Sequence, residues 1–500
     1  MTPKHFPRIP QTSRRGFMAR IGALIGASVM TIAGTPAAFA SAVGERLAAI
    51  RGRVIHRGDG NYIHWWASMV WYVFKPNRHP DIIVQAVSDE DVVNAVLHAR
   101  ETGMKVAVRA TGHNPARGCL RQGGVLISLS DMREVTIDAQ AETAWIEPGI
   151  HSEKLIEKTR KAGFAFPAAH TGIVGMGGYL IGGGLGWNMP EWDIACRSIL
   201  AAEIVLADGR KVIASETENT DLLWAVRGAG PGFFGIVLRY KLKLYPLHTH
   251  ITKSKYLLPL DKLPEICAAL EDLVKAKETR LEVLAVIGRF YPPSKPPEER
   301  DLVCAVSLVA FADSDGDAAR LLAPVADMPF GALALLKKEN ARLSYPELYA
   351  GQETDFSSPN RTAVENVWTD DPSTVLQKLA ARLHEIPTAS PRSFALSAWA
   401  FNGERNDPTS CVQTAADHYV SWYLMAEREA DIEPNRIWMD ESVAELRPHA
   451  KGHYINEIDP LRYPQHVAEC FAPEDWKRLV DLRRLYDPDG VFHSYLGHDA

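Results

Sequence analysis

Two glycine-rich segments, about 60 residues apart in a chain of 500, constrain this protein more than any other feature. The first has the sequence RATGHN at 109–114, and the second has VGMGGYLIGGGLGW at 174–187. Glycine lets the backbone approach a ligand closely, and bare backbone N–H groups suit a diphosphate. His113 adds a nucleophilic side chain beside that cradle. The pair therefore predicts a tightly held nucleotide cofactor.

Two common nucleotide-binding motifs are excluded. The run GGGLG at 182–186 lacks the G-x-G-x-x-G spacing, and no acidic residue closes a βαβ unit about 20 residues later. The chain also has no Walker lysine pattern. The glycines therefore belong either to a different cofactor-binding fold or to tight turns, which glycine-rich runs alone form more often.

Composition limits the classes of partner. Hydrophobic residues make up 46% and charged residues 23% of the chain, which is typical of a globular protein of two or three domains. The net charge of −6 carries no basic surplus, so we expect neither nucleic acid nor an anionic membrane as a partner.

Six cysteines are spread through the chain without CxxC spacing. This spacing favours neither a zinc nor an iron–sulfur site, and we predict no metal. An exported protein could form one or two disulfides, which the sequence cannot pair. Burial as small apolar side chains is the interpretation that we favour for most of them.

The N-terminus has the features of an export signal. The sequence SRRGFM at 13–18 resembles the twin-arginine motif, an apolar stretch follows at 21–34, and Ala38-Phe39-Ala40 offers a cleavage site. We predict a signal peptide at 1–40, the twin-arginine export machinery as a partner, and a periplasmic or secreted protein. The apolar stretch is short for a membrane span, so we expect no stable membrane insertion; an uncleaved anchor is the alternative.

Several segments together resemble one flavoprotein superfamily. The first glycine segment, with Gly118 and Gly123-Gly124, is similar to the R-x-G-G-H-[NS]-x-x-G loop of the PCMH-type flavoproteins related to vanillyl-alcohol oxidase. The second glycine segment resembles the second loop of that family, and the match continues through 208–210, 221–228 and 234–237. Tyr454-Ile455-Asn456 and Tyr486-Asp487-Pro488 resemble the C-terminal segment of the berberine-bridge-enzyme-like subgroup.

This resemblance implies an α+β fold with two parts. Residues 76–248 correspond to a two-subdomain PCMH-type FAD-binding domain, preceded by an N-terminal segment at 41–75. Residues 249–450 correspond to an α+β substrate domain, an antiparallel sheet covered by helices. Within it we expect helices at 261–277 and 373–386 and strands at 302–311 and 393–401. Residues 451–500 correspond to a segment that returns to the FAD domain, with a helix at 473–486.

The resemblance implies FAD as the cofactor, bonded covalently to His113. Many relatives carry a second link from a cysteine, and Thr171 stands at that position here, so we expect a single attachment. The other residues expected to contact the cofactor belong to the matching segments: Arg109, Ala110, Thr111, Gly112, Asn114, Gly118, Val174, Gly175, Gly177, Gly178, Tyr179, Gly182, Gly184, Gly235, Ile236, Val237, Tyr454 and Asn456.

Three of these residues are also implied in catalysis. Tyr454 corresponds to the base that deprotonates a substrate hydroxyl, although a phenol with a pKa near 10 needs that pKa lowered, or a relay. Asn456 corresponds to a residue that orients the tyrosine or the flavin ring. A small residue at Val174 goes with oxygen access in the family. Glu457 and Asp459 are alternative carboxylates for which we expect solvated loop positions.

The predicted function is an FAD-dependent oxidase that acts on a small hydroxyl-bearing molecule, with oxygen as the acceptor and hydrogen peroxide as the product. A dehydrogenase that uses a periplasmic acceptor, and a flavoprotein that binds a ligand without turnover, remain alternatives. The tryptophans at 65, 66 and 71, with Tyr72, belong either to a packing segment or to a substrate wall, and we favour packing.

Overall fold

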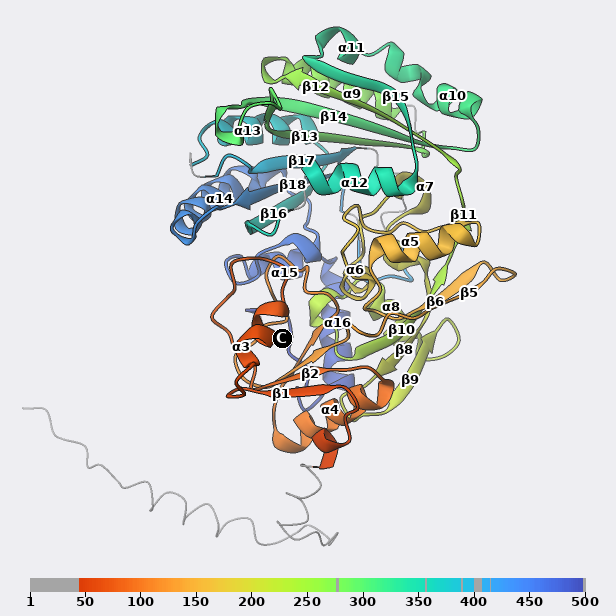
Figure 1. The fold of residues 1–500 in the computed structure, drawn as a ribbon, viewed down its shortest axis with the longest axis vertical. Helices are drawn as coiled ribbons and strands as arrows, with labels where there is room; N and C mark the ends of the chain where they lie inside the picture. The colour runs from red at the N-terminus through yellow and green to blue at the C-terminus, as the bar shows by residue number, and fades with distance from the viewer. Residues whose placement is uncertain are drawn as a thin grey trace, which may run out of the picture. The chain divides into compact units, whose positions relative to one another are not determined.

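In the described part of the chain, three β-sheets of four, five and seven strands, a small two-stranded sheet (β7 and β11) and the helices around them build the body of the molecule (Figure 1). The computed structural model describes residues 45–275, 278–355, 358–387, 390–399, 407–413 and 415–497, and residues 46–500 belong to one compact unit. The predicted signal peptide lies outside the described residues. Within the described residues, no helix has the length and apolar character needed to cross a bilayer.

The first sheet is mixed and has the strand order β1-β2-β4-β3. Strands β2, β4 and β3 are parallel, and β1 joins them antiparallel. Helix α4 begins where the Ser88 hydroxyl caps the Asp91 N–H, and it ends at Gly103, whose φ of 68° continues the chain toward β3. The bounds are β1 Arg53–His56, α3 Tyr62–Ser68, β2 Ile82–Gln85, α4 Asp89–Thr102, β3 Val106–Arg109 and β4 Val125–Ser128.

The second sheet is antiparallel in the order β5-β6-β10-β8-β9. Its apolar side chains join those of the surrounding helices in one buried cluster that includes Trp187, Trp224 and Phe166. The bounds are β5 Val135–Asp138, β6 Thr143–Ile146, α5 Ser152–Lys161, β7 Phe164–Ala165, α6 Met176–Ile181, α7 Met189–Trp192, β8 Ile199–Val205, β9 Lys211–Ser215, α8 Thr220–Val226, β10 Ile236–Lys243 and β11 Tyr245–Pro246.

The third sheet has seven antiparallel strands in the order β15-β12-β14-β13-β17-β18-β16. Helices α9, α10, α13 and α14 lie against one face of it (Figure 1), where their apolar side chains join those of the strands, and the opposite face holds a smaller apolar cluster. The bounds are β12 His250–Pro259, α9 Leu263–Lys275, β13 Leu281–Tyr291, β14 Asp301–Ala312, α10 Asp315–Ala326, α11 Phe330–Leu333, β15 Leu336–Leu343, α12 Tyr345–Asp355, β16 Arg361–Thr369, α13 Pro372–His384, β17 Phe394–Trp399, β18 His418–Met425 and α14 Ile432–Leu446.

The α+β class and its antiparallel, helix-covered sheet are confirmed. The predicted helices and strands of this region correspond to α9, α13, β14 and β17, with ends that differ by a few residues. After α15 (Gln465–Glu469), helix α16 spans Pro473–Tyr486, with a proline in its first turn as helix starts favour.

All six cysteines are free, and all but the half-buried Cys119 are buried, as expected for small apolar side chains.

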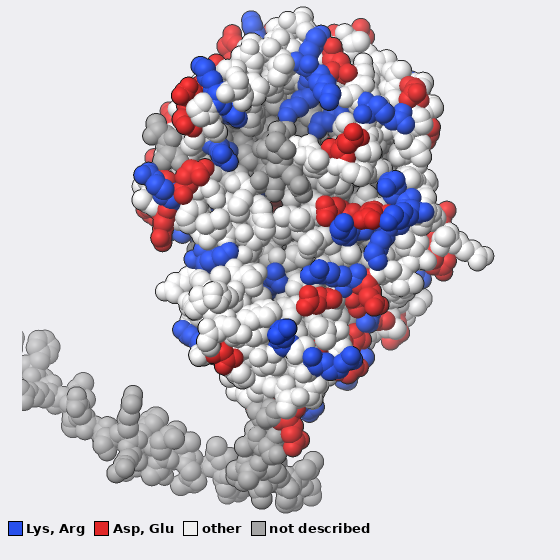
Figure 2. Space-filling view, in the orientation of Figure 1, with Lys and Arg blue, Asp and Glu red and all other residues white. Residues whose placement is uncertain are grey.

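Lysine and arginine side chains alternate with aspartate and glutamate over the face drawn in Figure 2, without a broad field of one sign.

Candidate active site

A cavity of about 400 Å³ joins the two glycine segments to the uncovered face of the seven-stranded sheet. Strand β3 delivers the first segment to it, and β13, β16, β17 and β18 contribute side chains from the sheet. Most of the predicted site residues line this cavity: Arg109, Ala110, Thr111, Gly112, His113, Asn114, Gly118, Thr171, Val174, Gly175, Gly177, Gly178, Tyr179, Gly235, Ile236, Val237, Tyr454 and Asn456.

Gly182 and Gly184 do not line the cavity but support it from behind. A Cβ atom at Gly182 would collide with the side chain of Asn456. The Gly184 N–H donates a hydrogen bond to the Tyr454 hydroxyl at 3.1 Å. Both glycines therefore position the two polar side chains of the C-terminal segment.

The first glycine segment bends sharply after β3. Gly112 has a φ of 81°, and a Cβ there would collide with the Met69 carbonyl. The guanidinium of Arg109 stabilises this turn, because it donates hydrogen bonds to the Met69 carbonyl at 2.7 Å and to the Ser128 hydroxyl at 2.8 Å. Its observed bonds thus stabilise the loop itself.

Thr111 links the two glycine segments. Its hydroxyl accepts a hydrogen bond of 2.9 Å from the Gly175 N–H, across 64 residues of sequence. A Cβ at Gly175 would collide with the Thr111 side chain, so glycine is required for this approach. Thr111 therefore joins the two loops.

His113 sits on the cavity wall as a neutral imidazole. Burial, reinforced by the positive charge of Arg361 and by His151, lowers its pKa to about 3. The Trp71 ring stacks on it at 4.9 Å between centroids, and the Tyr72 hydroxyl donates to its carbonyl at 2.9 Å. The side chain is therefore held in its nucleophilic, unprotonated form.

The Tyr454 hydroxyl is buried at the cavity with donors around it. It accepts hydrogen bonds from the Gly184 N–H at 3.1 Å and from the Asn456 amide at 3.0 Å. Burial raises the pKa of Tyr454, and these hydrogen bonds act in the opposite direction. The donors would stabilise a phenolate oxygen at this point.

Glu457 was expected in a solvated loop, but the structure places it half-buried on the cavity wall. Its carboxylate accepts hydrogen bonds from Tyr419 and from Tyr423, the latter at 2.7 Å. The guanidinium of Arg361 lies 4.3 Å from the centre of the Tyr423 ring. Because the hydroxyls of Tyr419 and Tyr423 are hydrogen-bonded to the Glu457 carboxylate, they take the place of bulk water around it.

Sequence patterns did not reveal several wall residues. Arg361, Tyr419 and Tyr423 come from strands whose alternation fits an ordinary sheet. His170 and Glu282 also line the cavity and form a 3.0 Å pair. Packing was the favoured interpretation for the N-terminal aromatic residues, but Trp71 and Tyr72 line the cavity, while Trp65 and Trp66 pack against a buried apolar cluster.

The cavity fits the cofactor that the glycine segments predict. Gly178 lines the cavity, and a Cβ added there would meet no atom within 4 Å, so every larger residue would extend into open space. Across the wall, a Cβ at Gly177 would strike Pro148 and Ala110. A bare backbone therefore faces the open cavity at Gly178 and close packing at Gly177, which leaves room for a diphosphate.

Comparisons with known proteins identify the family. Residues 80–215 match the FAD binding domain family. The chain is 33% identical over 463 residues to the (R)-6-hydroxynicotine oxidase of Paenarthrobacter nicotinovorans, which covers 89% of this chain and 96% of that protein. The chain belongs to the FAD-linked oxidoreductases.

Solved structures show the same fold for this FAD-linked oxidoreductase. The 6-hydroxy-D-nicotine oxidase of Arthrobacter nicotinovorans superposes with a TM-score of 0.75 at 22% identity, over 90% of this chain and 99% of that one. The berberine-bridge-enzyme-like protein 1 of Physcomitrella patens gives 0.77 at 17% identity, over 92% and 100%. These likenesses show the fold that was expected from the sequence.

Proposed function

We propose that this protein is an exported oxidase that carries FAD on a single covalent bond to His113. It takes a hydride from a carbon bearing a hydroxyl, in a sugar, alcohol, phenolic or polycyclic substrate, and reduces oxygen to hydrogen peroxide. The observation that carries the proposal is the Tyr454 hydroxyl, held at the cavity by the Gly184 N–H and the Asn456 amide.

Bound FAD supplies the hydride acceptor. The residues supply the proton chemistry and the orientation. Tyr454, as its phenolate, takes the substrate hydroxyl proton at its Oη and becomes the neutral phenol, and the two N–H donors stabilise the phenolate oxygen before that transfer. Because burial raises its pKa, Tyr454 needs these donors to act near neutral pH. His113, neutral because it is buried, offers a ring nitrogen for the covalent bond.

Covalent attachment is tested by acid precipitation followed by mass measurement of the peptide that contains His113. We expect an FAD increment on that peptide in the wild type and in His384→Ala, a change at an exposed histidine of α13. His113→Ala should release all flavin into the supernatant. Flavin in the wild-type supernatant would refute attachment.

The acceptor is tested by reducing the protein without air and then admitting oxygen. We expect rapid reoxidation with release of one peroxide per flavin, and slower reoxidation in Val174→Leu, since Val174 lines the cavity. A slow wild type that accelerates only with an artificial electron acceptor would favour the dehydrogenase. A panel of sugars, aromatic alcohols and polycyclic hydroxyls then identifies the substrate class.

Export is tested by fractionating cells that express the full chain. We expect wild-type protein outside the cytoplasm and the double variant Arg14→Lys, Arg15→Lys inside it, because the paired arginines carry the address. A substitution of Arg8 by lysine, outside the motif, is the matched control. Equal export of the double variant would contradict the twin-arginine route.

A further inference from the structure

A second cluster of titratable side chains lies outside the cofactor cavity. Glu365 on β16, His453 just before Tyr454, and His466 on α15 are all buried, and one ligating atom from each lies within 4.8 Å of the other two. A separate cavity of about 270 Å³ reaches them, and none of its lining residues lines the first cavity. The reaction proposed above uses none of the three.

We propose that Glu365, His453 and His466 bind a divalent transition ion of the zinc class, with Glu469 as a fourth ligand at the rim. Imidazole nitrogens and carboxylate oxygens are the donors that zinc takes from proteins besides thiolates. The Glu469 carboxylate lies 3.4 Å from Nε2 of His453 and is 42% exposed. It therefore stands between the buried donors and the cavity through which an ion would enter.

The surroundings orient two of the donors as outer contacts do in metal sites. Nδ1 of His453 lies 2.6 Å from the Asn366 carbonyl, which holds the ring proton there and leaves the lone pair on Nε2. One oxygen of Glu365 accepts from the Asp459 N–H at 2.7 Å. Its other oxygen, 3.1 Å from Nδ1 of His466, remains for the ion.

Ion binding requires a small local rearrangement. Donors bonded to one tetrahedral zinc lie about 3.4 Å apart, whereas the three donor atoms lie within 4.8 Å of one another, so the wider separations must shorten. The two imidazole rings are stacked, with centroids 3.9 Å apart and planes 15° from parallel. They must turn about their Cβ–Cγ bonds to converge, and the adjoining cavity gives them the space.

The ion would reinforce the placement of the catalytic segment. Asn366, next to Glu365, accepts from the Tyr454 N–H at 2.7 Å and donates to the carbonyls of Tyr454 and Glu457 at 3.1 Å. An ion held by His453, His466 and Glu365 would therefore clamp this segment onto β16. The expected role is structural, with an effect on stability first.

The test titrates the flavin-loaded, chelator-treated protein with Co²⁺ and Zn²⁺ separately. We expect one Co²⁺ per chain with visible ligand-field bands of a four-coordinate site, displacement by Zn²⁺, and a higher melting temperature with either ion. His466→Asn and Glu365→Gln should weaken binding tenfold or more, whereas His384→Asn on α13 should bind as the wild type does.

Equal binding by the wild type, His466→Asn and Glu365→Gln would overturn the site, as would a wild type that binds neither ion. If the two buried variants fail to bind flavin and thus do not fold, Glu469→Gln decides, because its side chain is at the rim. A Glu469→Gln variant with unchanged Co²⁺ affinity and spectrum would then contradict the proposal.

Discussion

At the scale of single residues, side-chain oxygens that accept from backbone N–H groups hold the candidate site together. Thr111 accepts from Gly175, and Tyr454 accepts from Gly184. In each pair the backbone donor belongs to the second glycine segment, which has little side-chain surface of its own. These hydroxyls therefore fix a backbone that would otherwise have much conformational freedom.

Thr111→Val keeps the shape of the side chain and leaves the Gly175 N–H without its partner. We expect a loss of about 1–3 kcal/mol in the free energy of unfolding, together with lower flavin content after purification. Denaturant titration and the flavin-to-protein absorbance ratio measure the two effects. Thr217→Val, at an exposed turn, is the control, and an equal loss there would contradict the assigned role.

Tyr454→Phe removes the proposed base while the ring remains. We expect kcat to fall about 10²–10⁴-fold, with flavin content retained and KM changed far less. Steady-state kinetics on the substrate found by screening measure this. Tyr486→Phe removes a hydroxyl that donates to Asp221 at 2.9 Å, outside the cavity, and should leave kcat unchanged. A wild-type kcat in Tyr454→Phe would exclude the tyrosine as base.

The residues of the candidate site could be predicted from sequence where they lie in a short, continuous segment. His113, Val174 and Tyr454 lie in such segments, and the structure brings all three to one cavity. Arg361 and Tyr423 could not be found, because a strand pattern tells which side chains share a face and not what lies opposite that face. The solvated position expected for Glu457 was wrong because a loop sequence does not show that Tyr419 and Tyr423 lie against its carboxylate.

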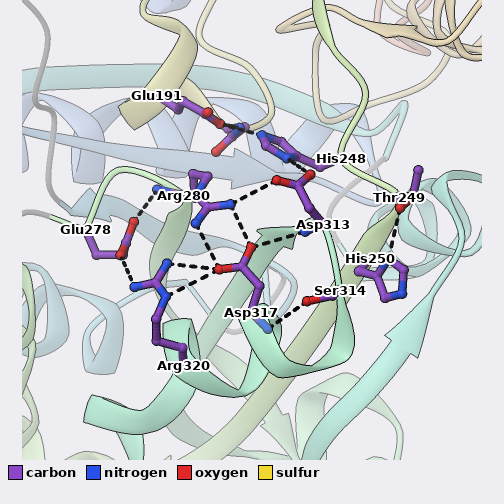
Figure 3. Close-up of polar contacts among 11 residues, drawn as sticks. Glu191, His248, Thr249, His250, Glu278, Arg280, Asp313, Ser314, Asp317 and Arg320 are labelled. Atoms are coloured by element: carbon purple, nitrogen blue, oxygen red, sulfur yellow. Dashed lines mark hydrogen bonds and ion pairs between the residues drawn. The ribbon is translucent and has the colours of Figure 1, made fainter.

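At the scale of elements, a polar network joins the start of the third sheet to helix α7. His248, two residues before β12, lies 2.9 Å from Glu191 of α7 and 2.8 Å from Asp313 after β14 (Figure 3). Arg280 continues the network by a two-bond contact with Asp317 in the first turn of α10. The carboxylates of Glu191 and Asp313 thus contact the two ring nitrogens of His248, between helix α7 and the third sheet.

This network makes a pH dependence of stability. Burial lowers the pKa of His248, but the hydrogen bonds with Glu191 and Asp313 outweigh it, so the net pKa is raised. The added stability is therefore complete below the unfolded value of about 6.5 and is lost as the pH rises through the folded value.

We expect the melting temperature of the wild type to fall as the pH rises from about 6.5 through the raised pKa of His248. The melting temperature of His248→Gln should be lower than that of the wild type at acidic pH, and it should fall less over the same pH range. Melting curves over a pH series measure this. His384→Gln, at an exposed position of α13, should follow the wild type. A His248→Gln slope equal to that of the wild type would remove His248 as the cause.

Elements were predictable where their periodicity was undisturbed. Helix α16 has the predicted bounds, and α4 carries both a serine cap and a terminal glycine. The order of the strands in the second sheet was not derivable from pattern alone, because β10 lies between β6 and β8 and pairs with both, although they precede it by many residues. The resemblance to a family supplied the architecture that local signals could not.

At the scale of the whole molecule, the last part of the chain completes the glycine-bearing half. Phe492 bridges parallel to Val106 of β3, the strand that leads to His113. The Val106 N–H donates to the Val491 carbonyl at 2.7 Å, and the His493 N–H donates back to Val106 at 2.9 Å. The cofactor cavity thus depends on β3 and on the last part of the described chain, since Phe492 and His493 also line it.

Asp487 holds the segment that pairs with β3 in place. Its buried carboxylate accepts from the Val491 N–H at 2.7 Å and from the Phe492 N–H at 2.9 Å. Asp487→Asn weakens both bonds, so we expect a loss of about 1–3 kcal/mol in the free energy of unfolding. Because Phe492 pairs with β3, flavin content should fall with it.

Asp489→Asn is the matched control, two residues away at an exposed position that pairs only with Arg100 in the described structure at 3.2 Å. Surface pairs of this kind contribute about 0–1 kcal/mol, so this variant should keep wild-type stability and flavin. Denaturant titration separates the two variants. If Asp487→Asn lost stability yet bound flavin fully, the segment 491–493 would stabilise the fold without shaping the cavity. The loop that carries His113 would then hold its position without the pairing between this segment and β3.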